Sequence, residues 1–120
     1  LYAELAETIA EVELSIGLGN EAYQLASSAI AALAAAGTDT PNRLILVAAR
    51  SAVSASRHEH AAKLLNGLAG SDEPEVEALR GLIEQERGRY DEAIRLLESA
   101  VSRMRGRAAD DGVAFKARLD

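Results

Sequence analysis

The chain contains no cysteine and no tryptophan, and its only aromatic residues are three tyrosines and one phenylalanine. Without cysteine it forms neither a disulfide framework nor a thiolate metal site, and the redox compartment stays undetermined. Aromatic residues are scarce although 48% of the chain is hydrophobic, with abundant alanine. This composition is typical of an all-α protein, and 120 residues suit a single domain over residues 1–120.

Positive charge is also in deficit. The formal net charge of −6 argues against nucleic acid as a direct partner, because phosphate contacts need clustered Lys and Arg. The basic group Arg103, Arg105 and Arg107 is interpreted as a helix C-terminal turn that complements the helix dipole. No apolar run approaches the roughly 18 residues that span a bilayer, so no membrane partner is expected. The chain begins at Leu1 rather than methionine, as an excerpt or a processed fragment would.

Residues that would support catalysis are missing as well. His58 and His60 are two residues apart at a helix start, so their side chains diverge by about 200° and do not share a metal. His58 is instead expected to replace a packing tyrosine. The glycines of "GLGN" (17–20) lie between two expected helices and lack a following lysine, which excludes a phosphate loop. We therefore expect no enzyme activity, no metal and no cofactor.

Stop signals such as glycine, proline and capping residues divide the chain into helices. The expected ranges are about 2–16, 21–36, 41–55, 58–68, 73–87 and 90–105, with a seventh helix beginning near Ala108. Leu5, Ile9, Val12 and Ile16 lie on one face of the first expected helix. In the third, the residues expected to face inward are Leu44, Ile45, Ala48, Ala49 and Ala52.

One pattern of glycine or serine, apolar residues and alanines occurs three times in the chain. Residues 87–101, "RGRYDEAIRLLESAV", form a helix start whose apolar stripe is Tyr90, Ala93, Ile94, Leu97 and Ala100. Residues 56–68 match this segment at an offset of 32, and residues 17–29 match the second copy at an offset of 39. Self-similarity at such periods indicates stacked helical repeats.

The third copy resembles the tetratricopeptide repeat, whose units are helix pairs of about 34 residues. Gly88, Tyr90, Ala93 and Ala100 match its second helix, and Gly81 matches a small residue of its first. No repeat has the family's tryptophan, the closing proline is missing after Val101, and Ser56 and Gly19 replace a glycine and an aromatic.

The fifth helix allows two registers. The family register places Glu77, Arg80 and Glu84 inward, whereas a slip of one residue places Val76, Leu79 and Ile83 inward. We favour the slipped register because unpaired buried charges are costly, although it gives up the match at Gly81.

The resemblance implies a right-handed solenoid of antiparallel helix pairs. The repeats would span about 3–36, 41–69 and 73–105, with 108–120 as a capping helix or the start of a fourth repeat. In this family the first helices line a concave face that holds a partner protein or peptide. The residues that fall on this face are Glu4, Glu7, Glu11, Arg43, Arg50, Glu77, Glu84 and Gln85.

A basic or amphipathic partner segment would suit the acidic first helix. In the alternative interpretation, these charges are solvated and pair with each other, each exposed pair contributing about 0–1 kcal/mol. The repeats are also similar to those of large bacterial regulators, in which a solenoid serves as the sensor or arm between an ATPase module and a DNA-binding module. A third possibility is self-association through a C-terminal helix that exposes Val113, Phe115 and Leu119.

Overall fold

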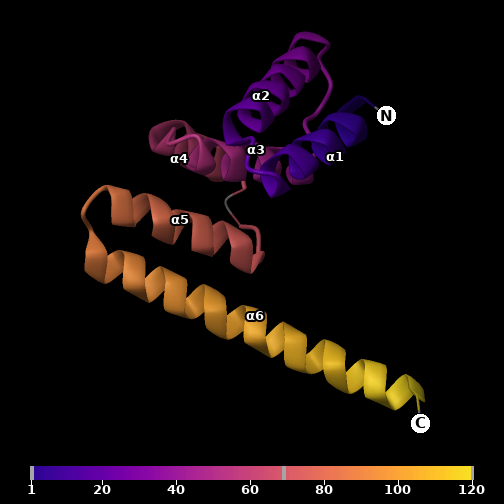
Figure 1. The fold of residues 1–120 in the computed structure, drawn as a ribbon, viewed down its shortest axis with the longest axis vertical. Coiled ribbons are helices and arrows are strands. Elements are labelled where there is room, and N and C mark those ends of the chain that lie inside the picture. The colour runs from indigo at the N-terminus through magenta and orange to yellow at the C-terminus, as the bar shows by residue number, and fades with distance from the viewer. Residues whose placement is uncertain (1, 69, 120) are drawn as a thin grey trace. The chain divides into compact units, whose positions relative to one another are not determined.

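The computed structural model describes residues 2–68 and 70–119, and side chains as far as residue 108. Within these ranges the chain is all-α, as expected, and consists of six helices; consecutive helices pack on each other within α1–α4 and within α5–α6 (Figure 1). They form two compact units, Leu1–Ser71 and Asp72–Asp120. The expected single domain over residues 1–120 stays a prediction. The helices are α1 (Tyr2–Ser15), α2 (Gly19–Ala35), α3 (Asn42–Ser54), α4 (His58–Asn66), α5 (Pro74–Glu86) and α6 (Tyr90–Leu119).

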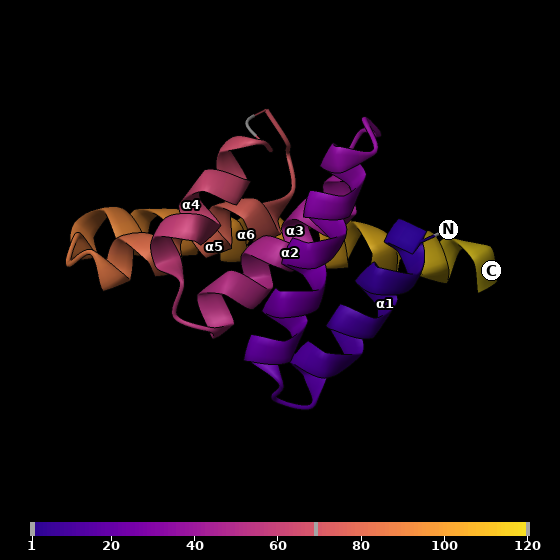
Figure 2. The same ribbon diagram turned by 90° about the horizontal axis from the view of Figure 1, so that it is seen from above.

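Three connectors of three residues each join α1 to α2, α3 to α4 and α5 to α6, and they share one backbone geometry. Their central residues have positive φ angles: 86° at Gly17, 62° at Ser56 and 79° at Gly88. In each connector, the backbone N–H of the central residue donates a hydrogen bond to the carbonyl oxygen three residues earlier. The N–H of the following residue donates to the carbonyl oxygen five residues before it, as Arg57 N–H does to Ala52 O at 2.7 Å. The second bond is the wide bond of a Schellman-type helix end. The same turn therefore recurs after 39 and then 32 residues. Figure 2 shows the ribbon of the connector between α1 and α2 and of the one between α3 and α4.

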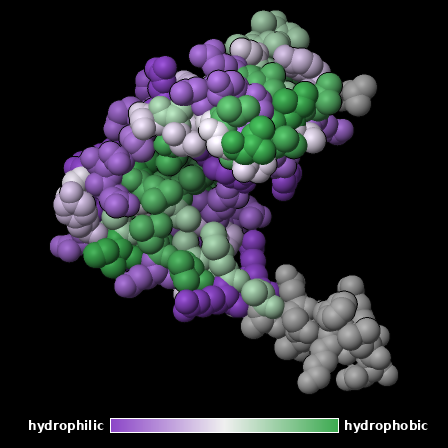
Figure 3. Space-filling model, in the orientation of Figure 1, coloured by the Kyte–Doolittle hydropathy of each residue, from purple (hydrophilic) through white to green (hydrophobic). Residues whose placement is uncertain are grey.

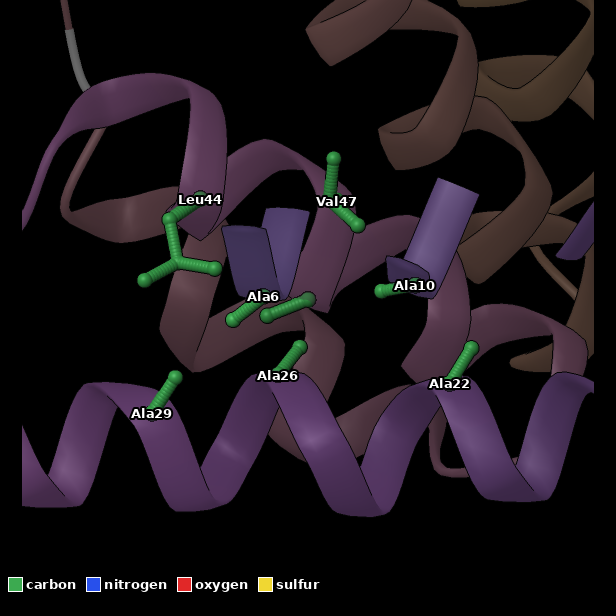
Figure 4. Packing of buried hydrophobic residues seen from close by; sticks show 8 residues of the cluster. Ala6, Ala10, Ala22, Ala26, Ala29, Leu44 and Val47 are labelled. Atoms are coloured by element: carbon green, nitrogen blue, oxygen red, sulfur yellow. The ribbon is translucent and has the colours of Figure 1, made fainter. Parts of the chain in front are cut away.

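Unit 1, residues 1–71, has a core of small side chains. Ala22, Ala26 and Ala29 lie along one face of α2 because their spacing of four and three residues follows the helical period. They pack against Ala6 and Ala10 of α1 (Figure 4). The α3 members of this cluster are Leu44, Val47 and Ala48. Small side chains let helix backbones approach closely, so three helices share a narrow core.

The apolar face of α1 is not its buried face. Leu5, Ile9, Val12 and Ile16 are 43–65% exposed, whereas Ala6 and Ala10 are buried. Close packing on α2 and α3 selects the alanine edge rather than the face with the largest side chains. The expectation for the third helix is confirmed, because its predicted inward residues are buried, apart from the half-buried Ile45.

Unit 2, residues 72–120, is the α5–α6 hairpin. Val76, Leu79 and Ile83 are buried, which confirms the slipped register. Gly81 is nevertheless buried too: a Cβ added there would lie 2.7 Å from Leu97 Cγ on α6. In the slipped register, α5 and α6 therefore still approach each other closely at Gly81.

The stripe expected on the sixth helix is only partly buried. Ala93 and Ala100 are buried and Leu97 is half-buried, but Tyr90 and Ile94 are exposed. As on α1, the face in contact is the one that carries the small residues.

The seventh helix was a wrong prediction, because α6 continues without a break from Tyr90 to Leu119. Nothing after Arg105 stops it: the chain has no proline there, and Gly106 is an ordinary helical glycine. Arg103 and Arg107 therefore do not form a terminal turn. Arg103 pairs with Glu77 of α5, and Arg107 pairs with Glu73, the residue directly before α5. The self-association predicted for Val113, Phe115 and Leu119 concerns side chains that lie outside the described ones.

Candidate interaction surface

On unit 1, three of the predicted groove residues come together between α1 and α3. Arg43 Nε lies 2.7 Å from Glu7 Oε1, and Arg43 Nη2 lies 3.2 Å from Glu11 Oε1. The hydrogen bond and charge of Glu7, followed by the charge of Glu11, raise the pKa of Arg43. One guanidinium group thus binds two carboxylates one helical turn apart on α1, in the pairing that the alternative interpretation described.

The other two groove residues of unit 1 lie on the same helices. Glu4 is exposed in the first turn of α1, where its carbonyl accepts a hydrogen bond from Thr8 Oγ1 at 3.0 Å. Arg50 is half-buried on α3. The set has three carboxylates and two guanidinium groups, so the acidic character expected of the first helix is largely balanced.

On unit 2, Glu77 and Glu84 are both held by arginines. Arg103 Nη1 lies 2.7 Å from Glu77 Oε2. The Ser99 hydroxyl, and after it Arg103, lower the pKa of Glu77 by hydrogen bonding to its charged form. Glu84 accepts bonds from Arg87 and from Arg89. The bond to Glu77 links α6 to α5, whereas the bonds to Glu84 come from the connector between the two helices.

The remaining predicted groove residue of unit 2 is Gln85, which is exposed near the end of α5. Because the predicted set is divided between two units, the described geometry brings together only its α1 and α3 members.

A polar aromatic cluster that sequence reasoning missed joins α2 to α4. The Tyr23 hydroxyl is hydrogen-bonded to His60 Nδ1, with the two rings edge to face at 5.4 Å. The Arg57 guanidinium lies 5.5 Å from the centre of the Tyr23 ring, a cation–π distance. Tyr23 and His60 are 37 residues apart, and no periodic signal links them. His60 thus has a packing partner, and among the described residues no cluster of potential ligands could hold a metal ion.

The largest feature left uncovered on unit 1 is apolar. Tyr2, Leu5, Ile9, Val12 and Ile16, here named the α1 stripe, are between 43% and 65% exposed. Their spacing of three, four, three and four residues keeps them on one side, with Ile16 directly after the end of α1. Figure 3 shows a hydrophobic (green) surface over α1. Scattered exposed apolar residues are ordinary, but a contiguous row marks an interaction surface.

No helix in the described part of the chain combines the length and the apolar character that crossing a membrane requires. No protein-family model, curated protein or solved structure matches this chain. Functional inference therefore depends on the residues themselves.

Proposed function

We propose that the chain is a protein-interaction module made of tetratricopeptide-like helix pairs in a short right-handed solenoid. Three observations support the repeat assignment. The connectors share one hydrogen-bonding pattern, an alanine is buried at the same place after each of them, and Gly81 is in close contact with the second helix of its pair. The alanines are Ala22, Ala61 and Ala93.

The binding role depends on one observation, the exposed α1 stripe. Apolar surface removed from water contributes about 25 cal/mol per Å², so five half-exposed side chains in a row are a large favourable term for any partner that covers them. A straight row along a helix fits another helix, because side chains at positions three and four apart interdigitate with the matching row of a partner. The partner segment we propose is therefore an amphipathic helix.

Charge has a secondary part in this proposal. Glu7 and Glu11 are already bound by Arg43, so a basic segment would have to displace an internal ion pair before it met them. Glu4 is exposed on the face of α1 that carries Glu7 and Glu11, away from the stripe, where a charge affects association rate and partner choice more than affinity.

The test is a pull-down from cells of the source organism, with the retained proteins identified by mass spectrometry and their binding remeasured by calorimetry with purified components. Ile9→Glu places a charge within the α1 stripe, and Gln24→Glu places the same charge on an exposed position of α2. We expect at least one protein to be retained by the original chain and by the Gln24→Glu variant, and to be lost from the Ile9→Glu variant. Identical sets from all three would contradict the proposal.

A further variant separates the apolar from the charged surface. The triple substitution Glu4→Lys, Glu7→Lys, Glu11→Lys leaves the α1 stripe unchanged. If this variant loses the protein while Ile9→Glu keeps it, the partner binds the charged face predicted from the family resemblance instead. Far-UV circular dichroism confirms that each variant is folded.

A further inference from the structure

The second hairpin of unit 1 shows what kind of structure covers the face that α1 leaves open. The connectors after α1 and after α3 are 39 residues apart, so the two helices hold equivalent positions in their hairpins. A shift of 39 residues pairs Leu5 with Leu44 and Ile9 with Ala48. Leu44 and Ala48 are 0% and 1% exposed, in one cluster with alanines of α1 and α2, and both of these helices contact α3. On α3 this face is therefore covered by a helical hairpin, and on α1 the same face is open.

An ion pair accompanies this contact beside the buried face of α3. Arg43 of α3 binds Glu7 and Glu11 of α1. The shift of 39 residues pairs Arg43 with Glu4, whose side chain is exposed. The position that holds a cation on α3 thus holds an anion on α1. A hairpin that covers α1 in the same way meets Glu4 with the residues that correspond to its own Glu7 and Glu11.

The sequence repeats this opposition of charge between the two positions. Glu11 and Arg43 are the acidic and basic members at the first repeat. Arg50 is the α3 equivalent of Glu11, and at the offset of 32 residues Glu75 is the α5 equivalent of Arg43. The second repeat therefore has the basic residue first and the acidic residue second. Opposite charges at a helix contact select the partner and its register, so a basic residue is expected opposite Glu4.

We propose that the α1 stripe is covered by a helical hairpin of a partner protein, packed as α1 and α2 pack on α3, whose first helix carries lysine or arginine opposite Glu4. The proposal rests on the proposed function and specifies the partner, because the second helix of this hairpin is the amphipathic helix that covers the stripe. Ile9 and Val12 are larger than their α3 counterparts Ala48 and Ser51. The partner therefore has small residues on its contact face, as α2 does, since large residues on both sides would overpack the contact.

The polar residue within the face to be covered is compatible with burial. The shift of 39 residues pairs Thr8 with Val47, which is buried on α3. The Thr8 hydroxyl already donates a hydrogen bond to the Glu4 carbonyl oxygen at 3.0 Å. A hairpin that covers this edge of α1 therefore leaves no hydroxyl donor unpaired.

An extended chain tests the contact with a probe of defined sequence. A second copy of residues 1–39, placed before Leu1, repeats the offset of 39 residues, and Glu7→Lys and Glu11→Lys in the added copy supply the basic residues. Covalent attachment gives a high effective concentration, so even a weak contact is populated. Ile9→Cys in the original α1 introduces a single thiol, since the chain has no cysteine of its own.

The rate at which this thiol reacts with a maleimide measures whether the stripe is covered. The thiol should react at least about tenfold more slowly in the extended chain than in the chain of original length, because a covered site must open before it reacts. Gln24→Cys in the original α2 is the matched control. Its equivalent in the covered hairpin, Lys63, is exposed, so the control thiol should react equally fast in both chains.

Charge variants test the basic residue opposite Glu4. If the added copy keeps Glu7 and Glu11, the protection of the Ile9→Cys thiol should fall by about two- to fivefold, the effect of one exposed ion pair. Glu4→Lys in the original α1 should reverse this order, so that the added copy with glutamates protects better than the one with lysines. Equal protection in all four combinations overturns the charge assignment.

Two results overturn the hairpin itself. One is an Ile9→Cys thiol that reacts equally fast in the extended and original chains, whether circular dichroism shows the added copy to be folded or unfolded. The other is a thiol in the original chain that becomes slower to react as concentration rises, because a second copy then covers the stripe. Neither result decides the pull-down, in which a single helix of another protein can still be lost from the Ile9→Glu variant. The failure of this proposal and that of the proposed function are therefore distinguishable.

Discussion

Gly81 provides the sharpest test of how α5 and α6 pack. It is a helical residue in the middle of α5, and a Cβ added there would lie 2.7 Å from Leu97 Cγ and 3.3 Å from the Ala93 carbonyl oxygen. The first distance is too short for two carbon atoms, and Cγ is the branch point of Leu97 rather than its flexible end. Gly81→Ala therefore forces α6 or the Leu97 side chain to move.

Two opposing terms determine the result. Replacing a helical glycine by alanine stabilises a helix by about 1 kcal/mol, because the unfolded chain loses backbone freedom. Overpacking a close contact costs about 1–3 kcal/mol. We expect Gly81→Ala to lower the free energy of unfolding by about 1 kcal/mol. Gly106→Ala is the matched control, because no atom lies within 4 Å of its added Cβ, and it should raise that free energy by about 1 kcal/mol.

Urea unfolding followed by circular dichroism at 222 nm measures both variants, fitted as two transitions if the two units unfold separately. A Leu97→Ala background removes the clashing atom, and there Gly81→Ala should become neutral or stabilising. The coupling between the two substitutions is the packing term itself. If Gly81→Ala stabilises the original chain as much as Gly106→Ala does, α5 and α6 do not approach as closely as described, and the reasoning is refuted.

Three further predictions concern other parts of the fold. Ala26→Leu should destabilise unit 1 by about 1–3 kcal/mol, because the larger side chain overpacks the core. Leu5→Ala on the exposed α1 stripe should change the free energy of unfolding by no more than about 0.5 kcal/mol. Urea unfolding of dilute samples measures both variants. Ser56→Gly should stabilise by about 1 kcal/mol, because glycine relieves the positive φ of 62°; a lower melting temperature would contradict this. Glu77→Gln should destabilise the protein at neutral pH, since the folded state lowers the pKa of the Glu77 carboxyl. The difference in stability between the original chain and the variant should vanish as the pH falls through that lowered pKa. Melting curves between pH 7 and pH 2 measure this difference.

The helices and their connectors were predictable because their signals are local. Glycine, proline and the recurring alanines indicated where five of the six helices end and which segments repeat. In α5, the cost of burying Glu77 and Glu84 unpaired was enough to choose the register that places Ile83 in the core. The end of α6 was missed because the sixth helix was expected to end at about residue 105, although no residue nearby adopts the left-handed conformation that follows the other hairpin helices.

The candidate site was harder to predict because it depends on contacts between distant segments. The pairing of Arg43 with Glu7 spans 36 residues, and the bond from Tyr23 to His60 spans 37. Neither follows from a helical period. The groove residues were assigned through a family pattern that describes positions but not which charges bind each other, so the internal ion pairs could be raised only as an alternative.

The exposure of the large apolar residues of α1 follows from how this fold is packed. Large apolar side chains dominate any helical periodicity in a sequence, so Leu5 and Ile9 outweigh Ala6 and Ala10 when the inward face is chosen from the sequence alone. Where helix backbones lie close together, the buried face instead belongs to the residues that allow the approach, and on α1 these are the alanines. α3 shows both requirements met at once, with Leu44 and the small Ala48 and Ser51 all buried. On α1 the large residues have no helix of unit 1 to cover them, and this exposed row is the reason we propose that a partner helix covers it.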